Sequence, residues 1–349
     1  MLLGTQFARV MSSLAAALCL LLPATLVAAP AEKAGGTQLI MLGTNGGPRI
    51  RKERAEPSTL LVVDGTAYLI DCGVGALRRI VEAGFAPEDV HTIFITHHHP
   101  DHDLDLANIM ASDLFSIGDN DGRKAWNIYG PPGTRRFVDA AVNYIGVPFG
   151  TFAAQGLAEP NIAGHFIAHD IAEAGDVYQD DKIRVTAIEN AHFALMSGAE
   201  RAHMKSYSYR FQTPHGVIVF TGDTGPSEAV AQFAKGADVL VSEVLSPKWL
   251  SKRAVNTATP GTDSRASKMA QHLAHEHLLP DAVAKIAREA NAKAVVLYHL
   301  VSGNDPADIA EIVDGVKKGY GGQTIASQDL ARYCINASDQ GGPVITNCP

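Results

Sequence analysis

The segment TIFITHHHPDHD, residues 92–103, places three consecutive histidines directly after a short apolar run. Its β-branched and aromatic residues predict a strand over residues 92–96, which ends where the histidines begin. Side chains two residues apart in an extended chain point the same way, so His97 and His99 can bind one metal ion. His98 then faces elsewhere, and we interpret it as a hydrogen-bonded or solvent-facing residue.

Pro100 follows the histidines and turns the chain. The turn lets Asp101 and His102 present a carboxylate oxygen and an imidazole nitrogen to a second point nearby. Such ligands suit zinc or another borderline divalent metal. Only one register of the pattern HxHxDH fits, so the segment predicts two neighbouring points at which a metal ion can bind.

Three more candidate ligands each follow a predicted strand. His192 follows the run VTAIENA, Asp223 follows VIVFTG, and His299 follows AVVLY. Ligands at the carboxyl ends of strands meet at one edge of a sheet, where loops form binding sites. Any one of these residues alone would more often be structural, but their order together with HxHxDH is hard to attribute to chance.

Short apolar runs alternate with helical patterns along the rest of the chain. Strands are predicted at residues 38–43, 60–64, 67–71, 92–96, 126–129, 183–188, 206–212, 217–222, 239–243 and 294–298. Helices are predicted at residues 74–83, 104–114, 134–145, 227–235, 264–273, 281–290 and 307–317. Because early strands follow one another and later strands are separated by helices, we expect mixed sheets with helices packed outside. Residues 148–181 and 246–263 show little regular pattern and are interpreted as insertions or lids.

Overall charge bears on the class of substrate. The chain has 349 residues, 46% of them hydrophobic, and a formal net charge of −8 with 29 lysines and arginines. Phosphate contacts need clustered positive charge, so this balance argues against a general nucleic-acid binder and favours small substrates. The loop GPRIRKER is locally basic, because it contains Arg49, Arg51, Lys52 and Arg54. It is either a solvated loop or a loop that attracts an anionic ester to the site. Arg210 could add to that attraction or form a structural ion pair.

Residues 1–29 read as a secretory signal peptide, in which Arg9 precedes a short apolar run and small residues follow. We therefore expect a periplasmic or secreted protein, with residues 30–349 as a single domain and no membrane span after cleavage. An uncleaved anchor helix is the alternative. In an oxidising compartment Cys334 and Cys348 could close a short loop, although the odd number of remaining cysteines leaves the pairing open.

These residues resemble the metallo-β-lactamase fold superfamily of metal-dependent hydrolases. Its five motifs are similar, in order, to Asp71 in LIDCG, the HxHxDH segment, His192, Asp223 in FTGDTG, and His299. The resemblance implies an α/β fold, a four-layer αββα sandwich of two mixed sheets. The loop LGTNGGP, the run SYSYRF, and His277, 22 residues before His299, resemble the branch with tRNase Z, arylsulfatase-like and cyclic-nucleotide phosphodiesterase-like enzymes.

The resemblance also implies roles for these residues. His97, His99 and His192 would hold one metal ion, Asp101, His102 and His299 a second, and Asp223 would bridge them. Two zinc ions are expected, with iron or manganese as alternatives, and a hydroxide bridging them would be the nucleophile. Asp101 would orient that hydroxide and His277 would protonate the leaving oxygen, although His272 and His275 crowd the same segment. Asp71 would hold a ligand histidine or a loop in place.

The sequence therefore favours a secreted binuclear metal hydrolase acting on a phosphodiester or sulfate ester, with a small anionic or ester substrate. Arg51 and Arg210 are the candidate anion-binding residues. A lactonase or other carboxylic ester hydrolase is the alternative. A β-lactamase is ranked lower because those relatives typically lack the aspartate seen at Asp223. A tRNA 3′-processing endonuclease is ranked lower because of the signal peptide, the acidic charge and the lack of an evident arm for an RNA elbow. A non-catalytic metal-binding protein is also less favoured, no nucleic-acid partner is expected, and a homodimer is left open.

Overall fold

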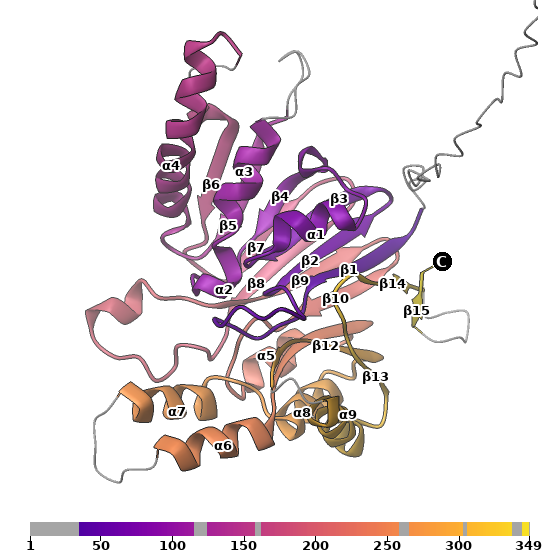
Figure 1. Ribbon diagram of the computed structural model, residues 1–349. Coiled ribbons are helices and arrows are strands. Elements are labelled where there is room, and N and C mark those ends of the chain that lie inside the picture. Colours follow the sequence, from indigo (N-terminus) through magenta and orange to yellow (C-terminus); the bar gives the residue numbers. More distant parts are fainter. Residues whose placement is uncertain are drawn as a thin grey trace, which may run out of the picture. The chain divides into compact units, whose positions relative to one another are not determined.

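Side-chain alternation in the central strands explains why the chain builds two sheets that pack face to face (Figure 1). In β1 (Thr37–Gly43), Leu39 and Met41 point into the core between the sheets, whereas Ile40 and Leu42 point to the opposite face. Each sheet therefore packs one face on the other sheet and needs helices to cover its second face.

The computed structural model describes residues 35–114, 124–157, 162–257, 265–302, 306–336 and 344–348. The first sheet has the order β15-β14-β1-β2-β3-β4-β5-β6. Its other strands are β2 (Ser58–Val63), β3 (Thr66–Cys72), β4 (Val90–Phe94), β5 (Trp126–Gly130), β6 (Phe166–Asp170), β14 (Ala331–Ile335) and β15 (Ile345–Asn347). The sheet is mixed, because its pairs are antiparallel from β15 to β3 and parallel from β3 to β6.

The second sheet has the order β13-β12-β11-β10-β9-β8-β7. Its strands are β7 (Gly175–Gln179), β8 (Arg184–Glu189), β9 (Tyr207–Thr213), β10 (Gly216–Phe220), β11 (Val239–Leu245), β12 (Ala294–Val301) and β13 (Gln323–Ala326). This sheet is also mixed, antiparallel from β7 to β10 and parallel from β10 to β13. The parallel strands carry their loops to one edge, which is where a site is expected.

Helices cover the outer face of each sheet. The helices α1 (Ala76–Glu82), α3 (Leu106–Leu114) and α4 (Thr134–Ala154) pack on the first sheet through residues such as Ile80 and Ile109. The helices α5 (Glu228–Phe233), α8 (Pro280–Glu289) and α9 (Pro306–Tyr320) pack on the second through residues such as Val283 and Ile312. The remaining helices are α2 (Pro100–Asp103), α6 (Pro247–Thr257) and α7 (Arg265–His275), with 3₁₀ turns at Pro87–Asp89, Ala163–His165 and Ala199–Ala202. The prediction of an αββα sandwich with mixed sheets is confirmed.

Two stretches predicted to lack regular structure contain it. Residues 148–181 hold the end of α4 together with β6 and β7, and residues 246–263 hold α6, with 258–263 lying outside the described part. The strand β6 escaped notice because Phe166 and Ala168 are buried while the equally apolar Ile167 is exposed, which hides the alternation. Both missed strands are short edge strands.

The C-terminal strands are joined covalently, because Cys334 on β14 forms a disulfide with Cys348, which follows β15. Cys72 is a buried free thiol. Residues from Lys33 on form one compact unit, and the predicted signal peptide lies outside the described residues. Within the described part of the chain, no helix is long and apolar enough to cross a membrane.

Candidate metal centre

The predicted ligand side chains meet beside a pocket of about 1020 Å³ at one edge of the two sheets. They are His97, His99, Asp101 and His102 around the start of α2, His192 after β8, Asp223 after β10, and His299 within β12. His299 (φ 42°) and Asp71 (φ 54°) have left-handed backbone conformations. Such conformations are rare outside glycine and cluster at functional sites, where they impose a side-chain direction.

Pro100 explains the local geometry of the HxHxDH segment. The strand β4 ends at Phe94, and His99 is extended, with φ −82° and ψ 147°, before Pro100 begins α2. Proline suits the first turn of a helix, because its fixed φ is helical and its missing N–H is not needed there. The change from extended to helical backbone separates His97 and His99 from the pair Asp101 and His102.

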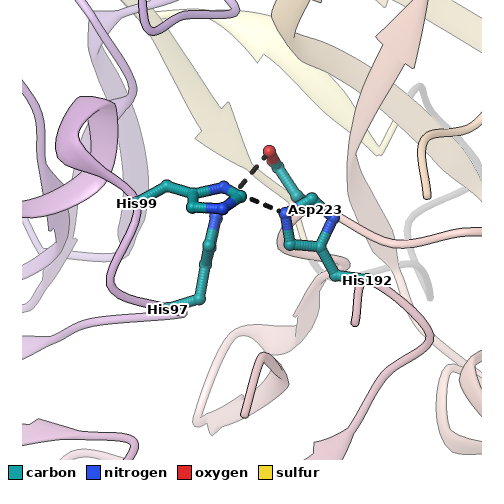
Figure 2. Close-up of side chains that lie close together, drawn as sticks. All are labelled: His97, His99, His192 and Asp223. Atoms are coloured by element: carbon teal, nitrogen blue, oxygen red, sulfur yellow. Dashed lines mark hydrogen bonds and ion pairs between the residues drawn. The ribbon is translucent and has the colours of Figure 1, made fainter. Parts of the chain in front are cut away.

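A first group of potential ligands consists of His97, His99, His192 and Asp223 (Figure 2). Their ligand atoms all lie within 4.8 Å of one another. Nε2 of His192 is 3.1 Å from Nδ1 of His99, and Nε2 of His97 is 3.9 Å from Oδ2 of Asp223. Side chains that follow β4, β8 and β10 thus converge on one point.

A second group consists of Asp101, His102 and His299. Oδ2 of Asp223 lies 3.5 Å from Nε2 of His102 and 3.1 Å from Nε2 of His299. Nε2 of His299 is also 3.4 Å from Oδ2 of Asp101. The carboxylate of Asp223 therefore faces both groups, which is the position that a bridging ligand needs.

The electrostatics of both groups fit cations. Burial lowers the pKa of the three histidines in the first group, which keeps their imidazoles neutral as metal ligation requires. Burial also opposes charge on His102 and His299, but Asp223 and neighbouring carboxylates outweigh it and raise both pKa values, that of His299 to about 10. The carboxylates thus favour positive charge at this point.

Unpartnered atoms support the same conclusion. Nε2 of His97, His102 and His299 and Oδ1 of Asp223 are buried and make no hydrogen bond within the described part of the chain. Buried polar atoms are normally hydrogen-bonded, so four such atoms in one cluster need another explanation. Neutral imidazole nitrogens together with carboxylate oxygens form a donor set that fits a divalent metal. These atoms therefore form a metal-binding site.

Asp71 fixes the orientation of one predicted ligand. Its Oδ2 lies 2.9 Å from Nδ1 of His102, and its Oδ1 accepts a hydrogen bond of 2.7 Å from the backbone N–H of Thr96. Because Nδ1 of His102 is engaged, Nε2 points to Asp223. The structure thus places Asp71 where it can hold the ring of His102, and its role in the site stays a prediction.

Gly47 brings the first loop against Asp101. Its N–H donates to Oδ2 of Asp101 at 3.0 Å. A Cβ at position 47 would lie 2.4 Å from both Cβ and Oδ2 of Asp101, so only glycine allows this approach. The Gly-rich segment LGTNGGP therefore serves to orient a carboxylate of the site.

Glu243 is a site residue that sequence reasoning missed. It lies fully buried in β11, and its Oε2 is 2.8 Å from Nδ1 of His277. Burial alone would lower the pKa of His277, but the charge of Glu243 and its hydrogen bond raise it. The available signal was a lone carboxylate in the otherwise uncharged strand VLVSEVL, since buried charges are normally paired.

The other histidines near the site divide by position. His277 and His272 line the pocket, whereas His275 is exposed and does not. His98 turns away from the cluster: its Nδ1 is 2.8 Å from Asp103 and its Nε2 is 3.2 Å from Oγ1 of Thr134. This is the hydrogen-bonded position expected for it.

The two predicted anion-binding arginines are engaged by backbone oxygens. Arg51 lines the pocket and donates to the carbonyl of Ser302 at 2.6 Å. Arg210 is not among the pocket-lining residues, and it donates to the carbonyls of Phe233 and Lys235 at 3.2 and 3.0 Å. The structure therefore does not bring Arg210 to the site.

Two other cations of the same loop face the pocket. Arg49 and Lys52 are exposed and line it. Arg54, by contrast, donates to Oγ1 of Thr44 and to the carbonyl of Ser327. Positive charge at the pocket thus comes from Arg49 and Lys52 together with Arg51, which keeps its charge when it donates to a neutral carbonyl, and Glu53 partly offsets it.

Curated relatives of the chain carry the name ribonuclease Z. The enzyme of Thermoplasma volcanium is 26% identical over 325 residues, which covers 86% of this chain and 98% of the relative. That of Mycobacterium avium is 30% identical over 210 residues, covering 60% of this chain and 70% of the relative. Two solved structures share the fold. YhfI of Bacillus subtilis has a TM-score of 0.60 and 16% identity, and the match covers 86% of this chain and 99% of that protein. Human tRNase Z, short form, has a TM-score of 0.58 and 17% identity, and the match covers 84% of this chain and 98% of that protein.

These relatives contradict two expectations. The ranking of a secreted small-ester hydrolase ahead of a tRNA 3′-processing endonuclease is wrong, because relatives aligned along most of the chain are ribonucleases Z. The expectation that nucleic acid is no partner is wrong for the same reason. Net charge misled both predictions, since a charge summed over the chain does not describe the local field at a pocket.

A family described as "Beta-lactamase superfamily domain" matches residues 66–300. The matched segment contains every predicted metal ligand, together with Asp71 and the pair Glu243 and His277. With the ribonuclease Z relatives, it identifies a metal-dependent hydrolase that acts on ester bonds. The chain belongs to the β-lactamase superfamily of metal-dependent hydrolases.

Proposed function

We propose that the chain is a ribonuclease Z-like endonuclease that hydrolyses a phosphodiester bond in RNA, with the 3′ end of a precursor tRNA as its substrate class. The observation that carries the proposal is the position of Asp223, whose carboxylate faces two buried ligand groups at the pocket. Two cations bridged in this way suit phosphodiester hydrolysis. The names of the relatives and of human tRNase Z support RNA as the substrate.

The proposed ligands follow from the two groups. His97, His99 and His192 would hold one cation, Asp101, His102 and His299 would hold the second, and the carboxylate of Asp223 faces both groups. Their nitrogen and oxygen donors suit zinc. Two bound cations lower the pKa of water and polarise the phosphate, which is the chemistry they supply.

The side chains of the chain itself orient the reactants and move the proton. Asp101, held by the N–H of Gly47, orients the attacking water. The water oxygen bonds to phosphorus and gives one proton to solvent, and the bond from phosphorus to the ribose 3′ oxygen breaks. His277 gives its proton to that leaving oxygen, while Glu243 holds the ring and stabilises its charged form. The products are a 3′-hydroxyl end and a 5′-phosphate end.

Arg49 and Lys52 supply the local positive charge that RNA needs. Both line the pocket and are exposed, so they can contact phosphates next to the scissile one. The positively charged side chains of Arg49 and Lys52 can attract a polyanion even in a chain of net charge −8. This is because the electrostatic field at the pocket depends mainly on nearby charges. RNA binding by this loop is therefore compatible with the acidic composition.

The test is cleavage of a precursor tRNA that carries a 3′ extension by protein of measured metal content. We expect a 3′-hydroxyl on the tRNA fragment and a 5′-phosphate on the extension. Arg49→Ala with Lys52→Ala should weaken RNA binding and leave hydrolysis of bis-p-nitrophenyl phosphate nearly unchanged. Protein that holds its metal and hydrolyses bis-p-nitrophenyl phosphate, yet cleaves no RNA, would contradict the proposal.

A further inference from the structure

His272 lies in the pocket wall beside the cluster and has no part in the steps above. It belongs to α7, and its ring centre is 5.8 Å from that of His99 and 5.3 Å from those of His192 and His277. Its side chain is 27% exposed, so it is open to the pocket while most of the ring is packed. A polar group so placed can contact a bound substrate directly.

Glu276 fixes the orientation of this ring. Nδ1 of His272 pairs with Oε2 of Glu276, one helical turn further on, and the Glu276 side chain is buried. The backbone carbonyl of Glu276 also lies 2.9 Å from Nδ1 of His192, so the same residue supports a predicted metal ligand. Glu276 thus contacts both the ring of His272 and the predicted metal ligand His192.

The pairing with Glu276 also determines what His272 offers to the pocket. A carboxylate accepts, so Nδ1 of His272 carries the hydrogen. In the neutral ring Nε2 is then a hydrogen-bond acceptor. Within the described residues Nε2 has no hydrogen-bond partner. With the ring neutral, the wall of the pocket presents an acceptor that a substrate hydroxyl can satisfy.

We propose that Nε2 of His272 accepts a hydrogen bond from the 2′-hydroxyl of the ribose whose 3′ oxygen leaves, and so selects RNA over DNA. The inference rests on the proposed function, because it assumes an RNA substrate and His277 as proton donor to the 3′ oxygen. The 2′ and 3′ oxygens are attached to neighbouring carbons of the ribose. The ring centres of His272 and His277 are 5.3 Å apart and their planes lie at 89° to each other, so each ring can contact one of these two oxygens. A deoxyribose would leave Nε2 without its donor.

The 2′-hydroxyl keeps its proton and its bond to carbon in this scheme. Water attacks phosphorus, the bond to the 3′ oxygen breaks, and the proton on that oxygen comes from His277. Attack by the 2′ oxygen would instead produce a 2′,3′-cyclic phosphate. The chemical nature of the product end therefore separates a recognition role for His272 from a role as base in a different reaction.

The experiment compares two RNA substrates that differ only at the nucleotide 5′ to the cleaved bond, one with ribose and one with 2′-deoxyribose. Wild type should cleave the deoxy substrate with a kcat/KM lower by about 3- to 10-fold, the effect of one neutral hydrogen bond. His272→Ala should cleave both substrates equally and keep its metal content. His272→Gln, whose amide oxygen can replace Nε2, should restore part of the preference, and His275→Ala, exposed on the same helix, should behave like wild type.

An unchanged ratio between the two substrates in His272→Ala would overturn the inference while leaving RNA cleavage, and so the proposed function, intact. Loss of a metal ion in His272→Ala would also overturn it, since His272 would then be a ligand. A 2′,3′-cyclic phosphate product together with complete resistance of the deoxy substrate would do the same. Absence of RNA cleavage by metal-loaded wild type would instead remove the proposed function, and the inference with it.

Discussion

Nδ1 of His277 lies 2.8 Å from Oε2 of Glu243, and both side chains are buried beside Asp223. A buried carboxylate next to an imidazole stabilises the charged ring and holds it in one orientation. The pair also lies within 4.8 Å of Asp223 and His299, so the same geometry would be compatible with metal ligation. Proton donation and metal ligation predict different consequences of mutation.

Mutation of the pair should affect turnover more than metal binding. We expect His277→Ala to lower kcat on RNA by about 10²- to 10⁴-fold, the usual range for loss of a general acid, with bound metal unchanged. Glu243→Gln should have a smaller effect in the same direction. The matched control is His275→Ala, two residues away and exposed. Loss of one metal ion in His277→Ala would show that the histidine is a ligand.

The close approach of Gly47 to Asp101 makes a second prediction. In Gly47→Ala the new Cβ would overlap Asp101, so the loop must move and the hydrogen bond to Oδ2 must lengthen. We expect kcat/KM to fall at least tenfold, with a loss of about 1 to 3 kcal/mol in the free energy of unfolding, as for other overpacked sites. The control is Gly146→Ala in α4, where an added Cβ would meet no described atom of another element within 4 Å and activity should stay unchanged.

Continuous apolar runs made much of the fold predictable. The strands β1 and β12 send alternate side chains into two different cores, so both of their faces are buried and their sequences are apolar almost throughout. The strands β13 to β15 were missed because they are short and lie at sheet edges or beside them, where burial no longer dictates composition. Strands with a strong pattern in their own sequence were therefore easier to predict than short strands whose place depends on partners elsewhere in the chain.

The candidate site shows the same division. His97, His99, Asp101 and His102 could be grouped from spacing alone, because they lie within six consecutive residues. The partner of Arg51 is Ser302, 251 residues away, and no local pattern indicates that this arginine is engaged. The roles of Arg49 and Lys52 likewise depend on which side of the loop faces the pocket.

A third prediction concerns stability in acid. The carboxylate of Asp180 accepts hydrogen bonds from the hydroxyls of Tyr68 and Tyr178 and from the N–H groups of Lys182 and Ile183. Burial alone would raise its pKa, but these hydrogen bonds lower it below the ordinary value near 3.8. Its contribution to stability is therefore present above that value and is lost as pH falls through the folded-state pKa.

Asp180→Asn tests this assignment by urea unfolding at several pH values. We expect it to destabilise the protein by about 1 kcal/mol at neutral pH, because part-buried donors lose a charged acceptor. The difference from wild type should shrink as pH falls below 4. A difference that stays constant down to pH 2 would show that the carboxylate charge has no part in it.

Localisation remains a prediction, since residues 1–29 lie outside the described part of the chain. The disulfide between Cys334 and Cys348 is compatible with an oxidising compartment. Fractionation of cells that express the full chain, with alkylation of free thiols, would test both points together. A protein found in the cytoplasm with both cysteines reduced would contradict the predicted export.

The central claim is that Asp223 bridges two cations that cleave RNA. Its most direct test is metal content per chain, measured together with precursor tRNA cleavage, in wild type and Asp223→Ala. We predict two ions and cleavage to a 3′-hydroxyl end in wild type, and at most one ion with no cleavage in the variant, its circular dichroism unchanged. An Asp223→Ala protein that keeps both ions and cleaves RNA at the wild-type rate would contradict the claim.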